Sequence, residues 1–162
     1  MNEESLELRI KKLIVDALML DDVTPEEIVD EEPLFVEMDG AVVNAIPSSR
    51  SGLQLAYTLD YRHQGLTPQF IEVELPGTDM AKEIAPARTF VLASEVEALR
   101  ASDLGAGANE ENTVVLDGDA PVHGELRFSD EPARHKLLDM LGDLYLLGAD
   151  IQGRISSTRS GH

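Results

Sequence analysis

The sequence predicts an α+β fold, in which one layer of mostly antiparallel sheet has helices packed on one face and follows an N-terminal amphipathic helical segment. Two patterns carry this prediction. Apolar residues recur at helical spacing in residues 5–20 and again in residues 131–147, whereas residues 41–46, 53–61 and 69–75 have the composition and alternation of strands. Turn-forming stretches separate the three strands, which favours an antiparallel meander.

The N-terminal segment begins with an amphipathic helix over residues 5–20, for which Ser5 is a suitable cap. A short second helix is predicted after Thr24. This stretch resembles the first helix and following loop of an acyl carrier protein. The serine that carries the prosthetic group in that family has no counterpart, since no serine lies between Ser5 and Ser48. We therefore interpret residues 1–36 as an acyl-carrier-like helical extension that packs on the rest of the chain or on another subunit.

The middle of the chain predicts a strand, a helix and a second strand in succession. A short helix over residues 78–84 is followed by a strand that includes residues 87–90. Ser94 is placed to cap the next helix, and residues 113–117 return as a strand. After the long C-terminal helix, residues 149–159 predict a further strand that brings the end of the chain back beside that helix.

The composition excludes several classes of function. Thirty-one acidic residues against thirteen basic ones give a net charge of -18, which argues against binding to nucleic acid and to anionic membrane surfaces. The absence of cysteine excludes disulfides and thiolate chemistry. The N-terminus lacks the pattern of a signal peptide, and no uncharged apolar run approaches the ~18 residues of a transmembrane segment. We expect a soluble, cytoplasmic protein.

One face of the long helix carries an imidazole and two carboxylates. His135, Asp139 and Asp143 are spaced i, i+4 and i+8, so they form a row along the helix. Two ligands one turn apart can bind the same metal ion, whereas Asp143 lies too far away and could instead hydrogen-bond a histidine. The alternative is an ordinary i, i+4 pair on a solvated face. Spacing alone leaves both interpretations open.

Several segments resemble one enzyme family. The run R-H-K-L-L-D-M-L-G-D-L-Y-L-L-G at residues 134–148, followed by S-G-H, is similar to the C-terminal domain of the UDP-3-O-acyl-N-acetylglucosamine deacetylases, the zinc hydrolases of lipid A synthesis. The segments G-L-Q-L-A-Y-T-L-D-Y (52–61), E-I-A-P-A-R-T-F (83–90) and E-E-N-T-V-V-L-D (110–117) match in family order. The resemblance covers roughly residues 41–162, which we interpret as a deacetylase C-terminal-like domain.

This resemblance implies roles for the residues of the helix and the chain end. His135 and Asp139 would be zinc ligands, and Lys136 would be a substrate-binding cation beside them. Asp143 would orient His162. The protonated imidazole of His162 would stabilise the oxyanion and protonate the leaving amine.

The resemblance also implies an acyl side of the site. Thr89 would help to hold the tetrahedral intermediate through its hydroxyl, and Phe90 would form part of the passage for the acyl chain. The family usually has a glycine after this phenylalanine, where this chain has Val91. Backbone geometry and the shape of the passage are therefore expected to differ at that point.

Half of the expected zinc site has no counterpart in this sequence. The family takes its third ligand and its water-activating glutamate from a Thr/Ser-Glu-His motif in an N-terminal domain, and no Glu-His dipeptide occurs here. A catalytic zinc normally has three protein ligands and a water molecule. The other two histidines, His63 and His123, lie in turn-like sequence and are interpreted as surface-loop residues.

Three hypotheses follow. The first is zinc-dependent hydrolysis of the N-acetyl group of a UDP-linked, 3-O-acylated glucosamine, with a separate chain as one source of the missing ligand and glutamate. The second is a non-catalytic module that binds an acyl chain or a partner, and whose binding ignores zinc chelation. The third is a truncated or chimeric fragment that exposes apolar surface and aggregates or dimerises.

Overall fold

The computed structural model describes most of the chain from the first strand onward. The helix predicted over residues 5–20 falls mostly outside the described residues, as do residues 160–162, so His162 is not placed and the acyl-carrier resemblance stays a prediction. After Thr24, the described part of the expected short helix is a 3-10 turn, η1 (Pro25–Glu27). The described residues are 5, 8, 11, 12, 15, 24–27, 33–38, 40–49 and 51–159.

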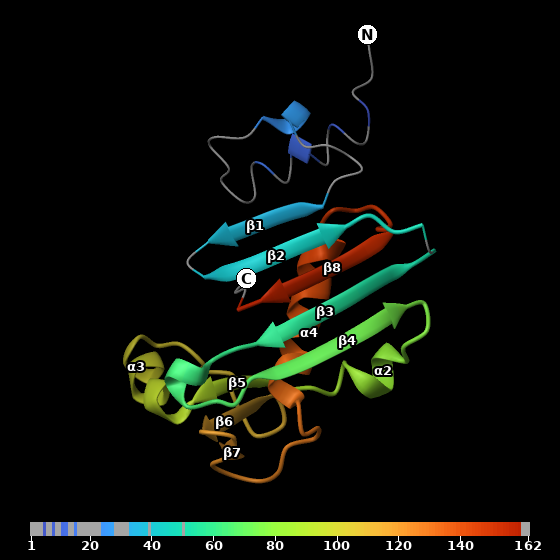
Figure 1. Cartoon of the computed structure of the whole chain (residues 1–162). Coiled ribbons are helices and arrows are strands. Elements are labelled where there is room, and N and C mark those ends of the chain that lie inside the picture. The colour runs from blue at the N-terminus through green and yellow to red at the C-terminus, as the bar shows by residue number, and fades with distance from the viewer. Residues whose placement is uncertain are drawn as a thin grey trace.

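The main layer is a five-stranded mixed sheet in the order β1-β2-β8-β3-β4 (Figure 1). Every neighbouring pair in it is antiparallel except β3 and β8, which run parallel. The predicted α+β class with mostly antiparallel pairing is therefore confirmed. The strands are β1 (Leu34–Met38), β2 (Ala41–Ile46), β3 (Leu53–Leu59), β4 (Gln69–Leu75) and β8 (Gly153–Thr158).

The predicted meander is wrong at one position, because the C-terminal strand β8 inserts between β2 and β3. Ile155 pairs with Ala45 on one side and with Leu55 on the other, and is 7% exposed. A central position buries this alternating strand, which an edge position would leave half exposed. Strand β1, which the sequence did not predict, pairs with β2 and forms the outer edge.

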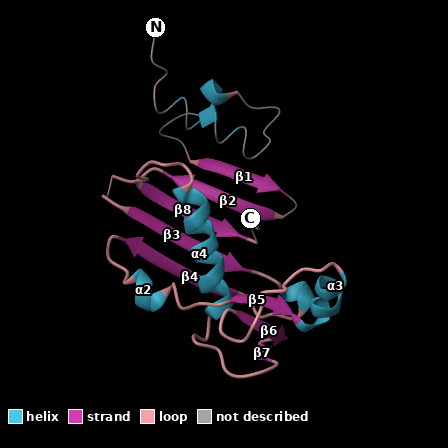
Figure 2. Cartoon of the chain, turned by 180° about the vertical axis from the view of Figure 1, so that it is seen from behind, coloured by secondary structure: helices cyan, strands magenta, loops and turns pink. Residues whose placement is uncertain are grey.

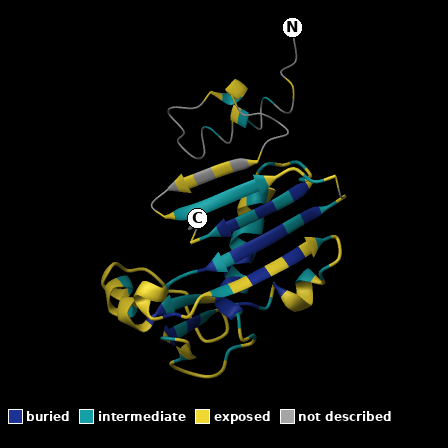
Figure 3. Ribbon diagram, viewed as in Figure 1, coloured by how far each residue is buried: buried dark blue, intermediate teal, exposed yellow. Residues whose placement is uncertain are grey.

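Helix α4 (Glu131–Tyr145) crosses one face of this sheet (Figure 2). Leu137 points into the core and is completely buried, as are Leu55 and Leu59 of β3. On β4, inward residues are buried and outward ones exposed, so the strand alternates along its length (Figure 3). Arg154 of β8 and Glu72 of β4 form an ion pair, with 2.9 Å between Nη2 and Oε2. Arg154 is partly exposed and Glu72 is exposed. The helix therefore covers the sheet on one side, as predicted.

The ends of α4 explain its position. Asp130 occupies the N-cap position, but its side chain makes no capping bond and instead pairs with Arg134 at 2.6 Å. Gln69 of β4 supplies an acceptor, because its Oε1 receives the Ala133 N–H at 3.2 Å. Gly148 follows the helix with a φ of 65°, a backbone conformation that suits glycine and ends the helix as predicted. The site-bearing helix is thus fastened to the sheet at its first turn.

A smaller sheet lies beside the beginning of α4, in the order β5-β6-β7 (Figure 1). Its parallel strands β5 and β6 are joined through α3, which confirms the predicted strand–helix–strand unit. Ser94 does not cap α3, since it lies inside a 3-10 turn, η3, in which Glu95 Oε2 accepts the Leu92 N–H at 3.4 Å. The remaining elements are α2 (Met80–Glu83), β5 (Thr89–Leu92), η3 (Ala93–Glu95), α3 (Val96–Ala101), β6 (Thr113–Asp117) and β7 (Ala120–Pro121), with η2 (Arg62–Gln64) after β3.

Within the described ranges, none of the helices combines the length and the apolar composition that crossing a bilayer requires.

Candidate active site

Five of the seven predicted site residues line one pocket of about 280 Å³ between the first half of α4 and strand β5. They come from segments about forty-five residues apart in the chain, and the fold brings them together. Three further residues that the sequence did not single out complete the lining. The pocket is lined by Tyr61, Thr89, Phe90, Leu92, Glu95, His135, Lys136 and Asp139.

The imidazole of His135 is held in a defined orientation. Its Nδ1 lies 3.1 Å from the carbonyl oxygen of Ala87, and a carbonyl can only accept a hydrogen bond. Nδ1 therefore carries a proton, and in the neutral ring Nε2 bears the lone pair. Nε2 lies 3.4 Å from Oδ1 of Asp139, so the ring nitrogen and the carboxylate face the same small volume.

Lys136 lies on the other side of the same carboxylate. Its Nζ is 3.2 Å from Asp139 Oδ2, and its side chain is only 10% exposed. Asp139 is thus placed between an imidazole and an ammonium group, one on each of its oxygens. In this partly buried position the ammonium is a fixed positive charge at the pocket wall, available to anionic groups that enter it.

Strand β5 contributes the opposite wall. Thr89 begins the strand with its N–H bonded to the Asn112 carbonyl at 3.2 Å, and its side chain is exposed to the pocket. Phe90 meets Tyr61 edge to face, with ring centroids 6.0 Å apart. Tyr61 in turn stacks on His63 at 6.2 Å. This wall therefore combines one hydroxyl with an aromatic surface.

The remaining predicted residues lie elsewhere. Asp143 is one turn beyond Asp139 on α4, exposed, and does not line the pocket. His162, its predicted partner, lies outside the described residues, so their pairing stays a prediction. His63, in the 3-10 helix η2, and His123, in the bend after β7, are both exposed, as expected, and neither lines the pocket.

A buried ion pair lies at the first turn of α4, one turn before His135. Glu131, 1% exposed, accepts a hydrogen bond from Arg88 Nε at 2.8 Å and another from the Arg127 N–H at 2.7 Å. Burial raises the pKa of Glu131, but the bonds from Arg88 and Arg127 outweigh it and hold the pKa below its ordinary value. The hydrogen bond to Glu131 likewise raises the pKa of Arg88. Both groups are therefore charged near neutral pH.

The sequence signals for the missed residues were weak. Tyr61 ends the G-L-Q-L-A-Y-T-L-D-Y segment that carries the resemblance, and Glu131 lies four residues before His135 on the same helix. Both positions could have drawn attention. Glu95 has no such signal, because its place at the pocket depends on the η3 turn.

The donor set suits half of a metal site. One imidazole nitrogen and one carboxylate oxygen converge, and the other imidazole nitrogen is bonded to a backbone carbonyl, which is the usual support of a metal-binding histidine. Within the part of the chain that the structure describes, no group of three or more His, Cys, Asp or Glu side chains could hold a metal ion. A complete catalytic zinc site needs one more protein ligand.

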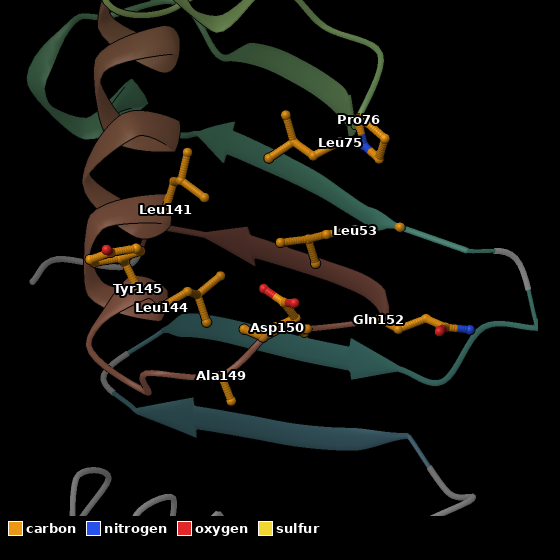
Figure 4. A pocket seen from close by; sticks show the side chains of 11 residues that line it. Leu53, Leu75, Pro76, Leu141, Leu144, Tyr145, Ala149, Asp150 and Gln152 are labelled. Atoms are coloured by element: carbon orange, nitrogen blue, oxygen red, sulfur yellow. The ribbon is translucent and has the colours of Figure 1, made fainter.

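A second, larger hollow of about 500 Å³ lies at the far end of α4 and contains none of the predicted site residues (Figure 4). Its walls come from the helix end, the segment before β8 and the adjoining ends of β3 and β4, and are mostly apolar. Tyr145 on its rim is 84% exposed. The hollow offers contact area and no cluster of reactive groups. Its lining includes Leu53, Leu75, Pro76, Leu141, Leu144 and Ile151.

Comparison with known proteins identifies a family whose match includes all the residues of this pocket. The family model described as LpxC, UDP-3-O-acyl N-acetylglycosamine deacetylase, matches residues 12–162. Proteins named UDP-3-O-acyl-N-acetylglucosamine deacetylase from Oleidesulfovibrio alaskensis and a Nostoc species are 38% and 40% identical over 133 and 121 residues. These matches cover 82% and 73% of this chain but 43% and 42% of the relatives. One from a Synechocystis species is 38% identical over 137 residues, 85% of this chain and 49% of the relative. The chain spans less than half the length of these relatives.

Proposed function

The chain belongs to the UDP-3-O-acyl N-acetylglycosamine deacetylase family, and from that premise we propose that it takes part in removing the N-acetyl group of a UDP-linked, 3-O-acylated glucosamine in lipid A biosynthesis. The observation that carries the proposal is the convergence of His135, Lys136 and Asp139 with Thr89 at one pocket. We propose a cytoplasmic location on composition, since a chain without cysteine fits a reducing compartment.

His135 Nε2 and Asp139 Oδ1 are the atoms that would hold a zinc ion. When bound, zinc supplies a Lewis acid and lowers the pKa of a coordinated water molecule toward ~7. The protein's part is to present both donors in one orientation. The Ala87 carbonyl fixes the ring of His135, and Lys136 restrains the second oxygen of Asp139.

The other residues of the pocket handle the substrate. The Lys136 ammonium is a fixed positive charge for the anionic part of the substrate. The Thr89 hydroxyl is available to donate a hydrogen bond to the oxygen of the tetrahedral intermediate. Phe90 and Tyr61 present an apolar edge beside this hydroxyl, which suits the acyl chain and reduces the access of bulk water.

Amide hydrolysis also needs a proton for the leaving group. Water adds its oxygen to the acetyl carbon, the carbon–nitrogen bond breaks, and the sugar amine leaves with a proton while acetate is formed. We assign the donation of that proton to His162, with Asp143 as the carboxylate that orients it. The third metal ligand and the group that activates water would come from protein outside the described residues or from a second chain.

A second candidate function is a non-catalytic module that binds an acyl chain or a protein partner. The observation in its favour is the apolar hollow of about 500 Å³ at the far end of α4, with Tyr145 exposed on its rim. Such binding would not depend on zinc.

Zinc titration calorimetry separates the two functions. The wild-type protein should bind about one zinc ion, and a His135→Ala, Asp139→Ala double variant should lose that binding. His123→Ala is the matched control, because it removes an exposed histidine away from the pocket and should leave binding unchanged. Amine release from the UDP-linked substrate is then measured on the wild type and the double variant. Zinc affinity that is equal in the wild type and the double variant would refute the proposed metal site.

A further inference from the structure

The strongest unexplained cluster is the ion pair of Glu131 and Arg88. Glu131 is the first residue of α4, and with 1% of its surface exposed it is the most deeply buried charged residue among those that the structure describes. Its two oxygens accept four hydrogen bonds, from the Arg88 N–H at 2.9 Å, Arg88 Nε at 2.8 Å, an Arg88 terminal nitrogen at 3.1 Å and the Arg127 N–H at 2.7 Å. A buried carboxylate with this many donors defines one arrangement of the groups around it.

In the chain, Arg88 lies between a residue that hydrogen-bonds to His135 and a residue that lines the pocket. The preceding residue, Ala87, is buried, and its carbonyl oxygen accepts the hydrogen bond from His135 Nδ1. The following residue, Thr89, presents its side chain to the pocket. Because the Arg88 N–H is itself bonded to Glu131, the backbone of this tripeptide is held against α4 at its middle residue. Any shift of Arg88 would move both neighbours.

Glu131, the acidic partner of the ion pair, also lies close in the structure to a predicted site residue. Glu131 lies four residues before His135, so the carboxylate and the imidazole lie on the same side of α4, one turn apart. Arg88 Nη1 donates to the carbonyl of Glu110 at 2.9 Å, and Nη2, which also donates to Glu131, donates to the carbonyl of Glu125 at 2.8 Å. These bonds fasten two loops to the same point. One helical turn and one three-residue segment are thus joined twice, by the ion pair and by the bond from His135 to Ala87.

We propose that Glu131 and Arg88 are positioning residues of the active site, which hold the Ala87 carbonyl on His135 Nδ1 and so keep Nε2, the nitrogen that bears the lone pair in the neutral ring, turned toward Asp139. The same contact places the Thr89 hydroxyl across the pocket. The role of His135 as a zinc ligand rests on the proposed function. The tautomer of its imidazole can be measured whether or not that function is correct. Supports of this kind change metal affinity by about 10–100-fold when removed.

The test compares two variants that each remove one negative charge from the start of α4. Glu131→Gln puts an amide opposite the N–H donors of Arg88 and Arg127, while Asp130→Asn removes a carboxylate that pairs with Arg134. Zinc affinity is measured by calorimetry. The His135 tautomer is read from long-range ¹H–¹⁵N spectra of ¹⁵N-histidine protein at about pH 8, where an ordinary imidazole is neutral.

Glu131→Gln should weaken zinc binding about 10–100-fold and shift His135 from the Nδ1-protonated form to a mixture of tautomers, while Asp130→Asn should change neither. A folded Glu131→Gln protein with wild-type tautomer and zinc affinity would overturn the proposal, as would equal effects of both variants. If the wild type binds no zinc, the proposed function fails and the tautomer comparison still decides this inference. If Glu131→Gln does not fold, Arg88→Lys, which keeps the charge but loses the forked bonds, is measured with the same expectation.

Discussion

Truncating Leu137 tests whether the packing of α4 on the main sheet is what holds the site helix in place. Leu137 lies between His135 and Asp139 and has no exposed surface. Leu137→Ala removes three buried carbon atoms from the contact of α4 with the sheet and leaves a cavity. Substitutions of this kind cost about 2–5 kcal/mol, since the lost transfer free energy and the cavity both contribute. Leu146, 83% exposed just after the helix, is the matched control, and Leu146→Ala should stay within about 0.5 kcal/mol of the wild type.

The measurement is urea unfolding followed by circular dichroism. With a slope of about 2 kcal/mol per molar urea, a loss of about 3 kcal/mol lowers the unfolding midpoint by about 1.5 M. The slope should stay constant between variants, because both unfold from the same compact state. A Leu137→Ala protein whose free energy of unfolding falls by less than about 1 kcal/mol would refute the reasoning, because the helix would then not depend on this contact.

Two further predictions concern a charge and a backbone position. The hydrogen bonds from the Thr67 side chain and then its N–H lower the pKa of Asp119, so this carboxylate stabilises the fold above the ordinary aspartate pKa and loses that effect as the pH falls through the lowered value. The difference in urea midpoint between wild type and Asp119→Asn should therefore be present at about pH 6 and shrink as the pH falls below the ordinary aspartate pKa of about 4, and a constant difference would contradict it. Gly153 has a φ of 148°, and an added Cβ would lie 2.9 Å from a backbone oxygen, so Gly153→Ala should lower the free energy of unfolding by about 1–3 kcal/mol. Gly107→Ala, where nothing lies within 4 Å of an added Cβ, should be near neutral in the same urea assay, and equal effects of the two would count against the reasoning.

Local patterns predicted the regular elements well. Strands β2, β3 and β4 and helix α4 lie where alternation and helical spacing indicated, because a half-buried strand and a half-buried helix each impose their own period on the sequence. The prediction that was wrong concerns which strands pair with each other. The position of β8 between β2 and β3 depends on which edges are open after the other strands pair, and local spacing carries no information on that choice.

Some residues of the candidate site could likewise be predicted from the sequence, and others could not. His135 and Asp139 face each other because four residues make about one helical turn, which spacing predicts directly. Thr89 and Phe90 were predicted through the family resemblance, and the structure brings them to the same pocket. Glu95 could not have been predicted, since it reaches the pocket only through the η3 turn that ends β5.

What the sequence determined by itself is most of the content of the molecule: helix α4 and strands β2, β3 and β4, its strong negative charge, and a histidine and a carboxylate one turn apart on one helix. Only the tertiary structure decided which groups surround that pair. Arg88 and Glu131 are forty-three positions apart, and their meeting depends on how β5 packs against the first turn of α4. Covalent spacing predicts contacts within one element, whereas contacts between elements follow from burying apolar faces together and pairing the polar groups that this burial removes from water.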